Sequence, residues 1–177
     1  MRAEWIPSNL VEKISGKFPE EVLGTGNFRG ETTLIIRPDA LVRICRALHD
    51  DPEMRFEFLS DIYSVDYPDR EKRFSVVYLL KSITHHHRLR LRADIPEKPG
   101  EIESVYPVWR AAGFLEREVY DLMGIRFLNH PDLRRIFMPE DFDGHPLRKE
   151  YPVEGKGWRN TNDFIPIEDI PVKGGSS

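Results

Sequence analysis

Acidic and basic side chains alternate with aromatic ones through residues 116–152, the stretch whose residue types are best suited to chemistry. Glu116, Glu118 and Asp121 stand close together there, and grouped carboxylates are typical of general acid–base catalysis. No nucleophile motif or substrate-binding signature accompanies them. Charges interrupted this often by large apolar residues instead favour side chains held in fixed geometry against another surface.

A helix over about 115–123 is predicted to carry these carboxylates, with Gly124 at its C-terminal stop. Arg117 and Asp121 are four residues apart, so one interpretation is a local pair along the helix surface. The other is pairing between elements or between chains, for which the candidate cations are Arg134, Arg135 and Arg148.

Histidines supply the candidate metal ligands. His85 and His87 would share one face of a strand, but no nearby carboxylate or cysteine completes a ligand set with metal-site spacing. We interpret the run that includes His86 as exposed imidazoles at a hairpin end. His130 and His145 each precede a proline and are interpreted as turn residues that make local hydrogen bonds.

Composition excludes several classes of protein. Cys45 is the one cysteine among 177 residues, so the chain has neither an internal disulfide nor the ligands for an iron–sulfur cluster, and a reducing compartment is expected. A net charge of −4 gives no overall attraction to nucleic acid or anionic lipid. No stretch approaches the ~20 apolar residues that cross a bilayer, and the N-terminus has no apolar run typical of a secretory signal.

Two further patterns are weak signals for binding. Arg88, Arg90 and Arg92 form a basic stripe that could bind RNA or an acidic protein, or be a solvated strand face. The negative overall charge and the lack of an evident stacking platform argue against nucleic acid. Residues 24–30 read as a glycine-rich loop, but Arg29 stands where a dinucleotide fingerprint requires its third glycine.

Apolar periodicity predicts the elements that position these residues. A helix over 8–18, capped by Ser8 or Asn9, is followed by a strand over 32–37 and a helix from Pro38 to His49 with Cys45 on its apolar face. Period-two alternation predicts three strands, over 54–58, 74–80 and 87–93, and their short connections favour an antiparallel meander. A short helix is expected over 105–111.

We therefore expect an α+β fold: a mostly antiparallel sheet with helices packed on one side, followed by an extended C-terminal arm. The α+β domain is assigned to residues 1–130 and the arm to 131–177, where prolines block long helices. The arm keeps apolar residues such as Trp158 and Phe164, which suit either its own domain or the surface of a partner.

The charged stretch closely resembles the signature of the cluster-free connecting-arm subunit of respiratory complex I, which in bacteria is the C-type subunit of NADH-quinone oxidoreductase. About residues 30–152 map onto that family, and Phe137 stands where it usually has an aliphatic residue. The matching residues are Glu116, Arg117, Glu118, Asp121, Leu122, Met123, His130, Arg134, Arg135 and Ile136, then Gly144–Lys149 with Tyr151 and Pro152.

The resemblance implies a non-catalytic, structural subunit with no active site of its own within a proton-pumping oxidoreductase. Its expected partners are the hydrogenase-like quinone-site subunit and the cluster-bearing subunits of the peripheral arm, on the cytoplasmic side of the bacterial inner membrane. The resemblance also favours an arm over 131–177 that wraps a partner subunit. FMN, iron–sulfur clusters and quinone would belong to the whole complex. Alternatives are a similar subunit of a membrane-bound hydrogenase or a photosynthetic complex I-like enzyme, or a free RNA- or protein-binding adaptor. The expected interface residues are Glu116, Arg117, Glu118, Asp121, His130, Arg134, Arg135, His145, Arg148, Tyr151, Trp158 and Phe164.

Overall fold

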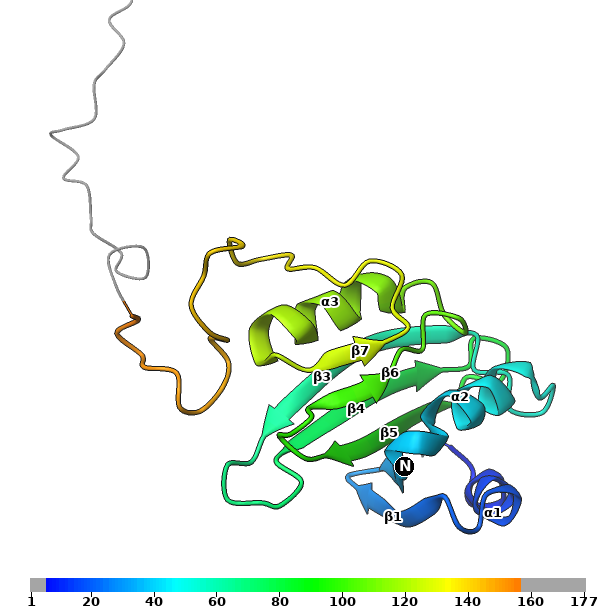
Figure 1. Ribbon diagram of the computed structural model, residues 1–177. Helices are drawn as coiled ribbons and strands as arrows, with labels where there is room; N and C mark the ends of the chain where they lie inside the picture. Colours follow the sequence, from blue (N-terminus) through cyan, green and yellow to red (C-terminus); the bar gives the residue numbers. More distant parts are fainter. Residues whose placement is uncertain (1–5, 157–177) are drawn as a thin grey trace, which may run out of the picture.

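Apolar residues at helical spacing form three α-helices, shown in Figure 1 for the computed structural model, which describes residues 6–156. Helix α1 (Ser8–Lys17) follows Pro7, and the 3-10 helix η1 (Pro38–Ala40) leads into α2 (Leu41–Asp50). Helix α3 (Ala112–Met123) ends at a glycine in the left-handed conformation. The predicted helices over 8–18, 38–49 and 115–123 are thus confirmed within a few residues.

Five strands form the main sheet in the order β1-β2-β5-β4-β3. The predicted strands over 74–80 and 87–93 are confirmed as β4 and β5, and they form an antiparallel meander with β3, which begins where the strand predicted over 54–58 was expected to end. Strand β2 pairs with β5 in parallel, so the sheet is mixed. A separate pair of short parallel strands, β6 and β7, brackets α3 in the chain. The strands are β1 (Val22–Phe28), β2 (Glu31–Ile36), β3 (Phe58–Asp66), β4 (Phe74–Lys81), β5 (Arg88–Ile95), β6 (Glu101–Glu103) and β7 (Arg126–Leu128).

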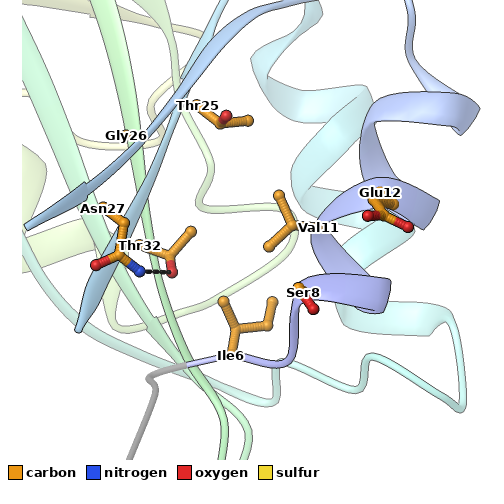
Figure 2. A pocket seen from close by; sticks show the side chains of 8 residues that line it. All are labelled: Ile6, Ser8, Val11, Glu12, Thr25, Gly26, Asn27 and Thr32. Carbon is orange, nitrogen blue, oxygen red and sulfur yellow. Dashed lines mark hydrogen bonds between the residues drawn. The ribbon is translucent and has the colours of Figure 1, made fainter.

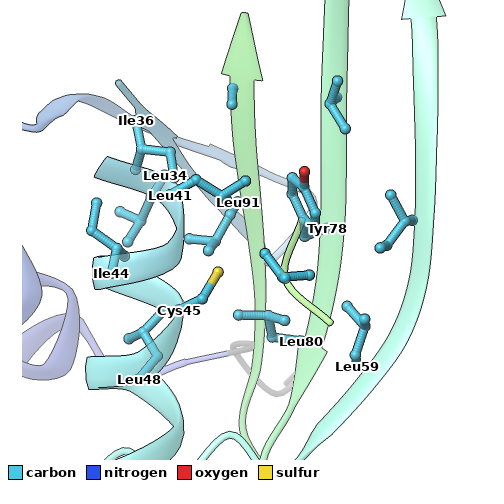
Figure 3. Close-up of a cluster of buried hydrophobic side chains, with 14 of the residues drawn as sticks. Leu34, Ile36, Leu41, Ile44, Cys45, Leu48, Leu59, Tyr78, Leu80 and Leu91 are labelled. Atoms are coloured by element: carbon cyan, nitrogen blue, oxygen red, sulfur yellow. The ribbon is translucent and has the colours of Figure 1, made fainter. Parts of the chain in front are cut away.

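One hydrophobic core joins the helices to a single face of the sheet. Ile44, Cys45 and Leu48 of α2 face Tyr78 and Leu91 of the central strands (Figure 3). Because its thiol is fully buried, the pKa of Cys45 lies far above its ordinary value, and the side chain is a core residue without nucleophilic character, as predicted.

Three expected elements are wrong. Residues 24–30 are strand β1 and the hairpin turn to β2, because an edge strand tolerates glycines. Residues 54–57 end a turn and continue as irregular chain, with Arg55 at φ 40° and the Phe56 amide donating to Leu48 O at 2.9 Å. Met54 and Phe56 are buried there, and this burial gives the same alternating pattern as a strand. Residues 105–111 form turns, since Pro107 lacks an N–H and restricts the residue before it.

Candidate functional site

Helix α3 directs its charged residues to different sides. Its buried residues include Ala112, Glu116, Val119 and Met123, whose spacing forms one stripe along the helix. Glu116 therefore lies in the middle of the stripe that faces the core. Its neighbours in sequence, Arg117 and Glu118, are only partly buried.

The carboxylate of Glu116 binds the chain that follows β6. Its Oε1 accepts a hydrogen bond from the Val105 amide at 2.7 Å, and its Oε2 accepts one from the Ser104 hydroxyl at 2.6 Å. Burial raises the pKa of Glu116 to about 7, although these two hydrogen bonds oppose the shift. The carboxyl group thus titrates close to neutral pH inside the protein.

His130 lies beside this carboxyl group, with its Nε2 3.8 Å from Glu116 Oε2. The Asp132 amide donates to its Nδ1 at 3.0 Å, so Nε2 carries the proton and donates to Gly113 O at 3.0 Å. The predicted local hydrogen bonds are confirmed for His130 with Asp132, whereas the bond to Gly113 spans 17 positions. For His145 the prediction is wrong, because its Nδ1 bonds the carbonyl of Asp121, 24 positions away. The side chains of Glu116 and His130 are 0% and 1% exposed, so both make their contacts inside the chain, and their assignment to a partner interface stays a prediction.

Asp121 is the second fully buried carboxylate of α3. Its Oδ2 accepts the amides of Ile136, Phe137 and Met138 at 3.0, 2.7 and 2.9 Å, and its Oδ1 accepts Arg135 Nη1 at 3.0 Å. Burial acts to raise the pKa of Asp121, but the three amides and the guanidinium outweigh it and hold the pKa below its ordinary value.

These contacts decide between the two pairing interpretations. The local Arg117–Asp121 pair is wrong: Arg117 instead donates to the backbone carbonyls of residues 134 and 135, at 3.1 and 3.0 Å. Pairing between elements is confirmed for Asp121 and Arg135. Arg135 also donates to the carbonyls of Phe142 and Gly144, both at 3.2 Å, so its guanidinium fixes a second loop.

Residues 131–156, here termed the return segment, also close the C-terminal end of α3. The last carbonyls of a helix have no partner within it. Here the carbonyls of residues 121, 122 and 123 accept hydrogen bonds from His145 Nδ1, the Leu147 amide and Arg148 Nε, at 2.8, 3.0 and 2.7 Å. A Cβ on Gly124 would lie 2.5 Å from the His145 ring, so the glycine also makes room for this closure. The block 144–149 is therefore a helix cap supplied from a distance.

A cluster of opposite charges binds the return segment to the sheet. Arg73 holds Asp66 in a two-pronged pair at 2.7 and 2.9 Å, and Asp66 also accepts the Lys149 amide at 2.9 Å. Arg73 pairs with Glu97 at 2.9 Å and with Glu150. We call the group formed by Asp66, Arg73, Glu97, Arg148 and Glu150 the Arg73 cluster; Arg148 lies 3.6 Å from Glu97 and 3.7 Å from Glu150.

The described half of the predicted arm, residues 131–156, consequently packs against its own domain, and no pattern in the sequence places Asp66 and Arg73 at this junction.

Tyr151 stacks on Phe142 within the return segment, with ring centroids 5.7 Å apart. Arg134 is exposed and pairs with Asp132 at 3.0 Å. Glu118 forms no ion pair within residues 6–156. Trp158 and Phe164 lie outside the described residues.

Several large apolar side chains remain exposed along this segment and on α3. Phe137 is 56% exposed, Leu147 58% and Phe114 66%, and Ile136, next to Phe137 in the chain, is 38% exposed. Asp121 fixes the backbone from which Ile136 and Phe137 project. The sequence did not single out these side chains as a surface, although the aromatic Phe137 departs from the family pattern.

The histidine run lies at the hairpin end between β4 and β5, as predicted, and His86 is exposed while His85 and His87 are half-buried and stack on each other. Among residues 6–156 no group of three or more possible ligands could hold a metal ion. The basic stripe is neutralised in part, because Arg90 pairs with Glu31 at 2.6 Å and Arg92 with Asp94 at 2.7 Å.

Comparison with known proteins gives the context for this arrangement. Residues 34–157 match the model of the family described as respiratory-chain NADH dehydrogenase, 30 Kd subunit. The chain belongs to this family. The match contains the whole of α3 and the return segment to residue 156, and it leaves out α1 and β1.

Curated relatives agree with the family. The chain is 48% identical over 148 residues to the C-type subunit of NADH-quinone oxidoreductase from Geotalea uraniireducens, which covers 84% of this chain and 89% of the relative. The corresponding protein of a Roseiflexus species is 42% identical over 146 residues, covering 82% and 84%. The resemblance carried by residues 116–152 is therefore confirmed.

Two solved structures share the fold. A trypsin-resistant fragment of Nqo5 matches with a TM-score of 0.58 and 34% identity, covering 71% of this chain and 97% of the fragment. A chain from the membrane-bound sulfane sulfur reductase, an archaeal respiratory membrane complex, matches with a TM-score of 0.69 over 82% of this chain and 85% of that one. At 20% identity the second likeness speaks for the fold alone. Among the described residues no helix has the length and apolar character needed to span a bilayer.

Proposed function

We propose that this family member is a non-catalytic structural subunit of a proton-pumping NADH-quinone oxidoreductase, in which it braces the hydrogenase-like subunit at the quinone site. The observation that carries the proposal is the return segment, whose backbone is fixed by buried charges while its apolar side chains point outward. Exposed apolar side chains on a fixed backbone favour protein–protein contact, because the partner need not order the loop on binding.

The contacts of the signature residues support this role. Asp121, Arg135, Arg117 and Arg148 all bind backbone groups of the chain, and such contacts shape a surface without turning over a substrate. The resulting docking surface consists of Phe114, Ile136, Phe137 and Leu147. Its neighbours in the complex would be the hydrogenase-like subunit and the cluster-bearing subunits, on the cytoplasmic side of the membrane.

The docking surface predicts a specific loss of assembly. We expect Phe137→Ser to change the free energy of unfolding of the isolated chain by less than about 0.5 kcal/mol, because the side chain is 56% exposed. We expect it to lower the amount of assembled complex at least about tenfold, the size of effect found at interface hot spots. Native gel electrophoresis and NADH–quinone reductase activity of membranes measure this loss.

The matched control is Ile83→Ser, which removes a similarly exposed apolar side chain from the turn between β4 and β5. It should leave assembly unchanged. Normal assembly of the Phe137 variant, or an equal loss with Ile83→Ser, would show that the return segment is not the docking surface.

The proposal also states that this chain binds none of the cofactors of the complex. We expect the purified full-length chain to contain no stoichiometric iron or flavin, because one buried cysteine cannot ligate a cluster. Metal analysis and the visible absorption spectrum measure both. Iron or flavin at one equivalent that survives gel filtration would contradict the proposal.

A further inference from the structure

Strand β1 is an edge of the five-stranded sheet whose outer side has no strand beside it within residues 6–156 (Figure 1). At the opposite edge, β3 packs against α3. Sheet edges are commonly protected by charged residues or prolines, yet none of the seven residues of β1 is charged or a proline. A bulge between Val22 and Gly24 affects only its start, so β1 presents a regular, unprotected edge from residue 24 onward.

The register of the hairpin tells which backbone groups face outward. Arg29 and Gly30 have φ of 55° and 88° and form a two-residue turn, which places Phe28 opposite Glu31. Hydrogen-bonded and non-hydrogen-bonded pairs alternate along an antiparallel ladder. Counted from the turn, Thr25 and Asn27 are non-hydrogen-bonded positions, so their amides and carbonyls point away from β2.

A groove runs beside this edge. Helix α1 lies next to β1, and a hollow of about 310 Å³ separates the two (Figure 2). Ile6 and Val11 give it an apolar part, and Gly26 can line it only with backbone. The lining residues are Ile6, Ser8, Val11, Glu12, Thr25, Gly26, Asn27 and Thr32.

We propose that an extended segment of a neighbouring subunit binds in this groove as an additional strand of the sheet, an inference that rests on the proposed assembly role. Its backbone pairs with Thr25 and Asn27 of β1. An apolar side chain of the segment faces Ile6 and Val11. A basic side chain faces Glu12, which is exposed and forms no ion pair within the described residues. Strand addition to a sheet edge derives its affinity from the backbone and its selectivity from such side-chain pockets.

The chemistry of the groove favours a different chain over a second copy. Residues directly opposite each other in an antiparallel pair share a face of the sheet. A twofold pairing of two β1 strands would therefore bring Thr25 and Asn27 of the copy to the groove. Both are short, polar and uncharged, so they match neither the apolar part nor Glu12.

Amide hydrogen exchange tests the proposal on the unmodified protein. We expect the amides of Thr25 and Asn27 to exchange at least about tenfold more slowly in the assembled complex than in the isolated chain, because they gain hydrogen bonds there. The amides of Gly24, Gly26 and Phe28 serve as internal controls, since they face β2 in both states. Equal exchange at Thr25 and Asn27 in both states would overturn the proposal.

A pair of variants gives the second readout. Thr25→Pro removes an outward amide and leaves the pairing with β2 intact, whereas Thr25→Val keeps the amide. We expect the first to lower the yield of complex several-fold and the second to leave it unchanged. Slow exchange in the isolated chain together with a doubled mass would assign the groove to a second copy and overturn the proposal. Slow exchange at Thr25 beside normal assembly of the Phe137→Ser variant would refute only the docking surface on the return segment.

Discussion

Asp121→Ala is expected to lower the free energy of unfolding by about 3–5 kcal/mol, the usual cost of removing one member of a buried ion pair. The substitution leaves the Arg135 guanidinium without its carboxylate, and it leaves the amides of Ile136, Phe137 and Met138 without their shared acceptor. The backbone that carries the docking surface should loosen as well. Chemical denaturation measures the first effect, and faster hydrogen exchange at residues 136–138 measures the second.

Glu118→Ala is the matched control, since it removes a carboxylate from the same helix at a partly buried position. Its effect on the free energy of unfolding should stay below about 1 kcal/mol.

The contribution of Asp121 to stability also depends on pH. Because its folded-state pKa lies below the ordinary 3.8, its stabilisation is present above that pH and is lost as the pH falls further. An Asp121→Ala protein as stable as the parent near neutral pH would contradict this account of the site.

Glu116→Gln is expected to have the opposite sign and to stabilise the protein at pH 8. The Glu116 pKa is raised from 4.5 to about 7, so at pH 8 the folded protein holds a carboxylate in its interior. A shift of this size corresponds to about 3 kcal/mol. Glutamine has no charge to bury, its carbonyl can accept the Val105 amide, and its amide can donate to the Ser104 hydroxyl.

The pH profile identifies the cause. Between pH 4.5 and 7 the folded state binds more protons than the unfolded state, so the Glu116 contribution to stability falls as pH rises and is lost above the folded-state pKa. Urea denaturation at pH 5 and pH 8 should show this fall in the parent and its absence in Glu116→Gln, with Glu118→Gln as control. A variant destabilised equally at both pH values would mean that the interior requires the charged carboxylate.

The elements with strong periodicity were predictable because one physical pattern decided each of them. Alternation over 74–80 and the apolar face of the helix that carries Cys45 both match the structure. Strand β1 escaped prediction because two glycines masked its pattern and its pairing depends on the turn at Arg29 and Gly30. A strand was wrongly predicted over residues 54–57, because the two buried side chains there, Met54 and Phe56, alternate with exposed ones without belonging to a strand.

The contacts of the candidate site likewise include some that the sequence could predict and some that it could not. Pairing of Asp121 with an arginine of the following segment followed from residue types, but the choice among three arginines needed the structure. The burial of Glu116 had a visible signal in the sequence, because Glu116 occupies the helical stripe of Ala112, Val119 and Met123. The cap on α3 had no comparable signal, because it joins residues more than twenty positions apart.

The Arg73 cluster bears on the order in which the protein forms. The Lys149 amide reaches Asp66 across 83 residues of sequence, and Glu150 reaches Arg73 across 77. Asp66 as acceptor and Arg73 as donor are both in place only after β3 and β4 have paired, so the entropic cost of closing so long a loop is offset late in folding. A newly made chain therefore fixes residues 148–150 only once β3 and β4 have paired. Under the proposed docking role, the partner subunit would bind chains whose core has already folded and would leave incompletely folded chains unbound.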